Sequence, residues 1–93
     1  MQLSQRLLTY AGSKGFSLDL DAESGVLSIY EKTEFSEPMC MYRVKPEDNF
    51  LYWHGTVYLD TAICRKLPQK IESETDLRGA LSQLAAELRQ AKD

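Results

Sequence analysis

The sequence has few of the residues that build specialised small proteins. Two cysteines are too few for a disulfide framework. No apolar run reaches the roughly 20 residues that cross a bilayer, since the longest uncharged run covers residues 49–59. Residues 1–15 lack the apolar segment of a signal peptide. We therefore expect a cytoplasmic protein with no membrane partner, whose Cys40 and Cys64 are reduced.

Basic charge is also scarce. The net charge is −3, with five basic and nine acidic residues in 1–60 and six basic and five acidic residues in 61–93. Nucleic-acid-binding proteins usually carry a basic stripe that neutralises phosphates. The only local basic cluster, Arg65, Lys66 and Lys70, is interpreted as a solvated loop. We predict that nucleic acid is not a partner.

Metal ligands are likewise sparse. Cys40, His54 and Cys64 are separated by 14 and 10 residues, whereas zinc sites usually contain closely spaced ligand pairs. Asp19, Asp21 and Glu23 alternate like the start of an EF-hand loop, but Tyr30 stands where that loop needs a bidentate Glu. We predict no metal and no cofactor, and we interpret the three acids as a solvated hairpin tip.

What the sequence does contain is enough apolar material for one domain. Its 93 residues are 43% hydrophobic and 10% aromatic, which supports a compact core over residues 1–93. Residues 3–13 have the apolar spacing of a short helix, and the alternation around 16–31 predicts a β-hairpin. Leucines at 77, 81, 84 and 88 predict an amphipathic helix that Ser73 or Thr75 caps.

The predicted fold class is therefore α+β: an N-terminal helix, an antiparallel sheet of three to four strands, and a C-terminal amphipathic helix packed on one sheet face. Two segments leave alternatives open. Residues 39–45 are a strand candidate whose register is ambiguous, because two sets compete for the core: Met39 and Met41, or Cys40, Tyr42 and Val44. Residues 61–71 are either a short strand or a helical turn.

The stretch "NFLYWHGTVYLD", residues 49–60, predicts the strongest strand. Alternate side chains point to opposite faces of a strand, so this one divides into two sets. The first set is apolar and should meet the helices: Leu51, Trp53, Gly55, Val57 and Leu59. The second set is amphipathic and should stay solvent-accessible: Phe50, Tyr52, His54, Thr56, Tyr58 and Asp60. A pure scaffold role and a binding face both fit the second set.

Catalysis is the weaker interpretation of this strand. Histidine is the natural acid–base residue near neutral pH, but the acid on its own strand face, Asp60, lies six residues away. At ~3.3 Å per residue this is about 20 Å, beyond hydrogen-bond reach. No nucleophile motif surrounds Cys40 or Cys64.

The leading hypothesis is a small non-enzymatic protein-binding module that regulates or inhibits a larger protein. Its small size, its acidity and its lack of motifs are typical of phage or mobile-element accessory proteins. The expected partner-binding residues are Tyr52, His54, Thr56 and Tyr58, with Asp19, Asp21 and Glu23 as an acidic rim. The alternatives are a small enzyme or enzyme subunit that uses His54, and a structural homo-oligomer such as a homodimer.

Overall fold

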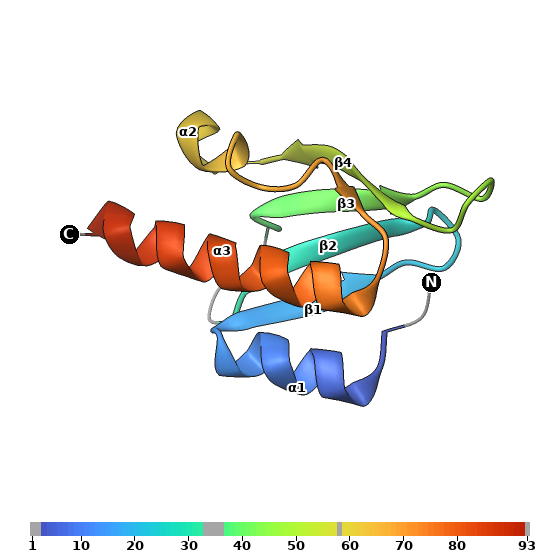
Figure 1. Ribbon diagram of the computed structural model, residues 1–93, viewed down its shortest axis with the longest axis horizontal. Helices are drawn as coiled ribbons and strands as arrows, with labels where there is room; N and C mark the ends of the chain where they lie inside the picture. The colour runs from blue at the N-terminus through green and yellow to red at the C-terminus, as the bar shows by residue number, and fades with distance from the viewer. Residues whose placement is uncertain (1–2, 33–36, 58, 93) are drawn as a thin grey trace.

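The computed structural model describes residues 3–32, 37–57 and 59–92, with side chains through residue 90. The chain forms an α+β fold with an antiparallel sheet (Figure 1). One helix precedes the strands in the sequence, and the longest helix follows them. The elements in chain order are α1 (Gln5–Ser13), β1 (Phe16–Leu20), β2 (Val26–Glu31), β3 (Cys40–Val44), β4 (Leu51–Thr56), α2 (Thr61–Cys64), β5 (Lys70–Ile71) and α3 (Glu74–Lys92).

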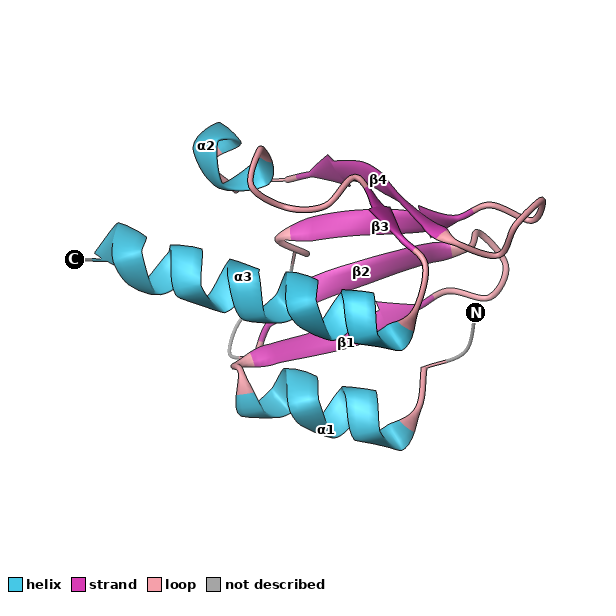
Figure 2. Ribbon diagram, in the orientation of Figure 1, coloured by secondary structure: helices cyan, strands magenta, loops and turns pink. Residues whose placement is uncertain are grey.

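The strands form one antiparallel sheet in the order β1-β2-β3-β4-β5 (Figure 2). The prediction of three to four strands is therefore wrong in number, because β5 adds a fifth. The segment 61–71 contains both elements that were considered for it, first the short helix α2 and then the two-residue strand β5. Asp60 begins α2 by accepting a hydrogen bond from the Ala62 N–H at 2.8 Å.

The predicted β1–β2 hairpin is confirmed. Leu18 pairs with Ile29 and Leu20 with Leu27, and the Asp21 N–H donates to the Val26 carbonyl at 3.0 Å. These pairs place the apolar side chains of both strands on one face, as the alternation requires.

The ambiguous register of β3 is resolved by the same alternation. Cys40 and Tyr42 are completely buried, whereas Met41 is half-buried and Arg43 is exposed. Tyr42 is buried because its hydroxyl has a partner: it donates to the Pro68 carbonyl at 2.8 Å. A buried phenol needs such a bond to offset the loss of water.

One core joins the helices to the inward face of the sheet. α3 crosses in front of the sheet in Figure 1, and α1 lies beside β1. Each element from α1 to α3 contributes buried apolar side chains to this core. The buried residues are Leu7, Ala11, Phe16, Leu27, Ile29, Met39, Cys40, Tyr42, Leu51, Leu59, Ile63, Leu67, Ile71, Leu77, Ala80, Leu81 and Leu84.

Two serines fix where the long helices begin. Ser4 caps α1 by accepting from the Leu7 N–H at 3.2 Å, and its hydroxyl also donates to the Glu74 carboxylate. Ser73, one of the two predicted caps of α3, accepts from the Asp76 N–H at 3.2 Å. The bond between Ser4 and Glu74 holds the first turns of the two helices side by side.

The buried hydroxyl of Tyr42 generates a stability prediction. Tyr42→Phe should lower the free energy of unfolding by about 1–2 kcal/mol, because the half-buried Pro68 carbonyl loses its hydrogen-bond donor. Urea denaturation measures the change. Tyr30→Phe is the matched control, since the Tyr30 hydroxyl makes no hydrogen bond with any residue that the structure describes. Equal midpoints for the two variants would contradict the prediction.

The buried thiol of Cys40 generates a pH prediction. Burial, with a smaller effect of Cys64, raises the pKa of the Cys40 thiol from 9.0 to about 12. Between these values the unfolded chain releases a proton that the folded chain keeps, so stability should fall as pH rises, by at most about 1.4 kcal/mol per pH unit. Cys40→Ala should show a shallower decline than the wild type in urea denaturation between about pH 8 and about pH 10.5. Parallel declines would refute this account.

Candidate interaction surface

The second face of the sheet consists of strand side chains that alternate with the buried ones. We call it the open face, and its members are half-buried or exposed. Cross-strand pairing aligns them in rows. One row crosses four strands as Val26, Arg43, Tyr52 and Lys70. The open face as a whole comprises Ser17, Asp19, Val26, Ser28, Tyr30, Met41, Arg43, Phe50, Tyr52, His54 and Lys70.

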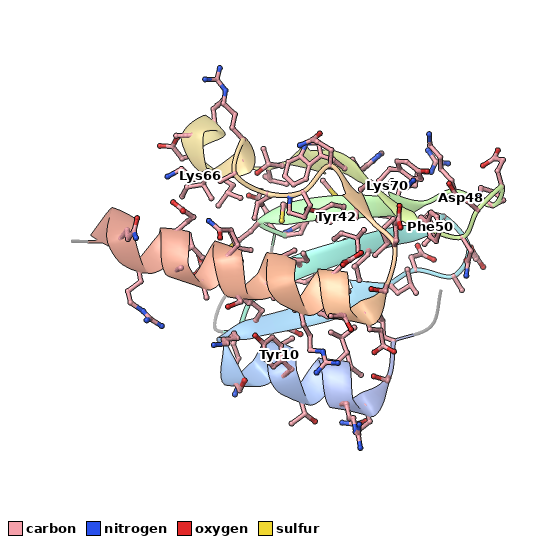
Figure 3. The ribbon with its side chains drawn as sticks, viewed as in Figure 1. Tyr10, Tyr42, Asp48, Phe50, Lys66 and Lys70 are labelled. Atoms are coloured by element: carbon pink, nitrogen blue, oxygen red, sulfur yellow. The ribbon has the colours of Figure 1, made fainter. Side chains whose placement is uncertain are left out.

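Aromatic rings and cations gather at one end of the open face. The Lys45 Nζ lies 4.1 Å from the centre of the Tyr52 ring, and the Lys70 Nζ lies 5.0 Å from that of Phe50 and 5.8 Å from that of Tyr52. Figure 3 shows Phe50 and Lys70 at the end of the sheet where β3 turns into β4. Cation–π attraction favours this arrangement and limits the motion of both rings. We call Arg43, Lys45, Phe50, Tyr52 and Lys70 the Tyr52 cluster.

Asp48 organises the turn beside the Tyr52 cluster. Its carboxylate accepts a hydrogen bond from the Tyr52 hydroxyl and another from the Phe50 N–H at 2.9 Å. The next residue, Asn49, adopts the left-handed conformation with φ 60°, which asparagine tolerates better than most residues. The hydrogen bond from Tyr52 lowers the pKa of Asp48, and the same bond raises the pKa of Tyr52. Tyr52 therefore contacts a carboxylate through its hydroxyl and an ammonium group over its ring.

An open hollow lies next to Tyr52. Its volume is about 490 Å³, and the 45–48 turn forms one wall while Arg43 and Tyr52 form the other. The Arg43 guanidinium makes no hydrogen bond or ion pair with a residue that the structure describes. The hollow can therefore accept a partner side chain beside a rigid ring and an arginine that is available for pairing.

The charges around the Tyr52 cluster are mixed in sign. Lys70 pairs with Glu72 at 3.1 Å. The acidic hairpin tip lies at the same end of the sheet, because the Val44 N–H donates to the Gly25 carbonyl at 2.8 Å. Asp21 and Glu23 are exposed there, and Asp19 lies on the open face opposite Ser28. The three acids of the predicted rim thus lie on β1 and in the β1–β2 turn, toward the same end of the sheet as the Tyr52 cluster.

Asp21 also has a local structural role. Its carboxylate accepts from the Glu23 N–H at 2.9 Å, and this bond is the main reason that the pKa of Asp21 is lowered. Side chains of Asp often close turns in this way. Asp21 therefore shapes the hairpin tip whether or not it meets a partner.

A bulge in β4 separates the predicted site residues. Tyr42 pairs with Trp53 and Met41 with Gly55, so His54 is an extra residue in β4. Gly55 has φ 153°, which side-chain-bearing residues rarely adopt. Bulges of this kind reverse the alternation beyond them. Tyr52 lies on the open face before the bulge and the exposed His54 is the bulged residue itself, but the residues after it do not continue that pattern.

The bulge changes the side of the strand on which Thr56 lies, although Thr56 stays exposed as the sequence predicts. Thr56 pairs with the buried Cys40, and its hydroxyl donates to the Met39 carbonyl at 2.6 Å and accepts from the Leu59 N–H at 2.9 Å. These bonds hold the end of β4 and leave Thr56 outside the open face. Tyr58, another predicted site residue, lies outside the described residues.

Trp53 does lie on the side of the helices. It is half-buried against the core, and its ring meets the Tyr42 ring edge-on with centroids 5.4 Å apart. Such T-shaped pairs are favourable beyond the area they bury. The division of β4 into two faces therefore holds from Leu51 to His54.

The remaining chemistry-bearing side chains are dispersed. Cys40 is buried, and its raised pKa keeps it protonated at neutral pH. Cys64 is half-buried and its thiol points to the Leu59 carbonyl at 3.8 Å. Within residues 3–32, 37–57 and 59–90, no three His, Cys, Asp or Glu side chains meet as a possible metal site. Among the described helices, none is long and apolar enough to span a membrane.

Sequence reasoning missed most of the Tyr52 cluster. Lys45 and Phe50 flank the turn at 46–49, and assuming a β3–β4 hairpin would have placed them together. Lys70 carried no such signal, because a two-residue strand has no detectable periodicity. Comparisons with protein families, with curated proteins and with solved structures found no match.

The bond between Asp48 and Tyr52 can be tested by titration. Asp48→Asn should lower the pKa of Tyr52, because the acceptor charge that favours the protonated phenol is removed. Tyr52→Phe should raise the pKa of Asp48 for the reciprocal reason. NMR detection of the tyrosine ring carbon and of the aspartate carboxyl carbon follows each group. Glu47→Gln removes a neighbouring charge without touching the bond and is the control. If Tyr52 titrates alike in the wild type and in Asp48→Asn, the bond does not exist in solution.

Proposed function

We propose that this protein is a small non-enzymatic binding module that captures a protein partner on its open face and so regulates or inhibits a larger protein. The observation that carries the proposal is the Tyr52 cluster, a set of aromatic rings in contact with lysine ammonium groups and beside an arginine that has no described partner, on a sheet face. Tyr, Phe, Met and Arg are enriched at protein–protein interfaces, and the open face contains all four types.

The rigidity of the cluster supports a binding role over a purely structural one. Association costs free energy whenever side chains must be ordered at the interface. The Tyr52 ring is already restrained by Lys45 and Asp48, so less ordering remains to be done on binding. Rigid tyrosines and arginines next to a hollow are the usual anchors of affinity.

The charge pattern favours a protein over a nucleic acid as the partner. A polyanion needs a surface of one sign, but here Lys70 is paired with Glu72 and the acidic hairpin adjoins Arg43. Protein surfaces carry interspersed charges of both signs, which select a partner and its orientation. Asp19, Asp21 and Glu23 then act as a rim that steers a basic region of the partner.

The size of the open face is adequate for this function. A standard interface buries about 800 Å² on each partner. That is about one seventh of the 5772 Å² that the chain exposes, which one face of a small domain supplies. No deep pocket is needed, and the described residues place His54 on this face without an adjacent acid on its strand.

The proposal is tested with a matched pair of double variants. Arg43→Ala with Tyr52→Ala removes an arginine and a large ring from the open face. Arg78→Ala with Leu8→Ala removes an arginine and a large apolar side chain from exposed positions on the helices. Calorimetry with the partner, first identified by photo-crosslinking from position 52, should show at least tenfold weaker binding for the first variant and unchanged binding for the second.

Two results would count against the proposal. Equal affinity of both variants would remove the open face from the interface, and a larger loss in the helix variant would move the interface to the helices. Circular dichroism must show that both variants are folded. Sedimentation at several concentrations distinguishes a separate partner from a second copy: a dimer that Arg43→Ala with Tyr52→Ala dissociates would identify the partner as the chain itself.

A further inference from the structure

A second hollow lies on the helix side of the sheet, at the opposite end from the Tyr52 cluster. Its volume is about 460 Å³, which is within the range of small-ligand sites. The end of α1, the first residue of β1, the end of β2 and the last turns of α3 surround it. We call it the α1–α3 hollow.

The floor of the α1–α3 hollow is apolar. Phe16 forms its base with only 4% of its surface exposed, and Ala85 and Leu88 of α3 are half-buried beside it. The walls are tied together, because the Lys32 N–H donates to the Gly15 carbonyl at 2.9 Å and Phe16 pairs with Glu31. Backbone hydrogen bonds therefore fix the part of the hollow that lies between the end of α1 and the end of β2.

The rim carries an excess of positive charge in an otherwise acidic chain. Among the described residues that line it, Lys14, Lys32 and Arg89 are positive and Glu31 is negative, which gives a net charge of +2, whereas the whole chain has −3. The Lys14 Nζ lies over the Tyr10 ring at 5.6 Å and also compensates the negative end of α1. Lys32, just after β2, and Arg89, on α3, are exposed and line the hollow from two different elements.

We infer that the α1–α3 hollow binds a small organic anion with an apolar body, of the class of medium-chain carboxylates. The hydrocarbon part would cover Phe16, Ala85 and Leu88, and burial of this surface drives binding. The carboxylate would lie at the rim between Lys32 and Arg89, where a guanidinium can bind it through two hydrogen bonds. This site is separate from the open face and does not depend on the function proposed for it.

Octanoate is the probe, and octylamine and octanol are the matched controls. The experiment titrates each compound into ¹⁵N-labelled protein and follows the backbone amides by NMR. Octanoate should cause saturable shifts at Gly15, Phe16 and Leu88. The octyl cation should bind at least tenfold more weakly, because the rim repels it, and octanol should bind about fivefold more weakly, because it lacks the charge. Inorganic phosphate, which lacks the apolar body, should cause no saturable shift.

Two variants separate the apolar and the ionic contributions. Ala85→Leu should abolish octanoate binding by filling the hollow without changing the charge, and leucine is nearly as good a helix former as alanine. Lys32→Gln with Arg89→Gln should weaken octanoate binding at least fivefold while leaving octanol binding unchanged. The control Arg78→Gln removes a positive charge from α3 outside the hollow and should bind octanoate like the wild type.

The inference fails if octanoate causes no saturable shift at the hollow, or if octanol binds as tightly as octanoate. It also fails if Lys32→Gln with Arg89→Gln leaves octanoate affinity unchanged, since the rim would then contribute nothing. If Ala85→Leu does not fold, the test rests on Lys32→Gln with Arg89→Gln and on the comparison of octanoate, octylamine and octanol. Saturable binding of phosphate alone would replace the proposed ligand class by simple anions and overturn the inference.

Discussion

The hydrogen bond from the Tyr42 hydroxyl to the Pro68 carbonyl connects the centre of the sheet to the chain that leads into β5. Tyr42 is completely buried on β3, and its ring also supports Trp53 on β4. Through these two contacts one side chain sets the position of β4 and of the segment before β5. Lys70 owes its place above Phe50 and Tyr52 to that segment. The arrangement of the open face is therefore determined from the buried side of the same sheet.

The open face and the α1–α3 hollow differ in charge pattern and in the size of the ligand that each suits. On the open face, rings are held by ammonium groups and by Asp48, so the surface is rigid and of mixed charge. In the α1–α3 hollow, buried and half-buried apolar side chains lie next to exposed cations. The first suits a large partner with its own charge pattern, and the second suits a small ligand with one charged end. Their separation lets a chain of 93 residues present both without conflict.

Long periodic elements were predictable from the sequence, and short or irregular ones were not. The spacing of Leu77, Leu81 and Leu84 located α3, and the alternation from Phe16 to Ile29 located the first hairpin, because burial repeats along these segments. β5 could not be predicted because its two residues are held by tertiary contacts, namely pairing with β4 and the Trp53 N–H that donates to the Gln69 carbonyl at 2.8 Å just before β5. The bulge at His54 was also invisible, since only the register with Met41 defines it.

The same difference between local and tertiary information explains why only some residues of the open face were predicted from the sequence. Tyr52 was identified from alternation within one strand, which is local information. Arg43 and Lys70 reach Tyr52 only through cross-strand register, which depends on turns and on tertiary contacts. Thr56 was misplaced because one extra residue reverses every later position. Such an error is expected wherever a strand is bent by its neighbours.

The irregular end of β4 affects the tendency of this protein to aggregate through the edge of its sheet. A long straight strand at the border of a sheet is a template on which other chains polymerise. Here that border consists of a two-residue β5 followed by a bulged strand with a glycine at its bend. This edge offers no long, regular row of backbone hydrogen-bonding groups on which another chain could pair. The aromatic strand β4 is therefore protected from edge-to-edge aggregation at the β5 side of the sheet.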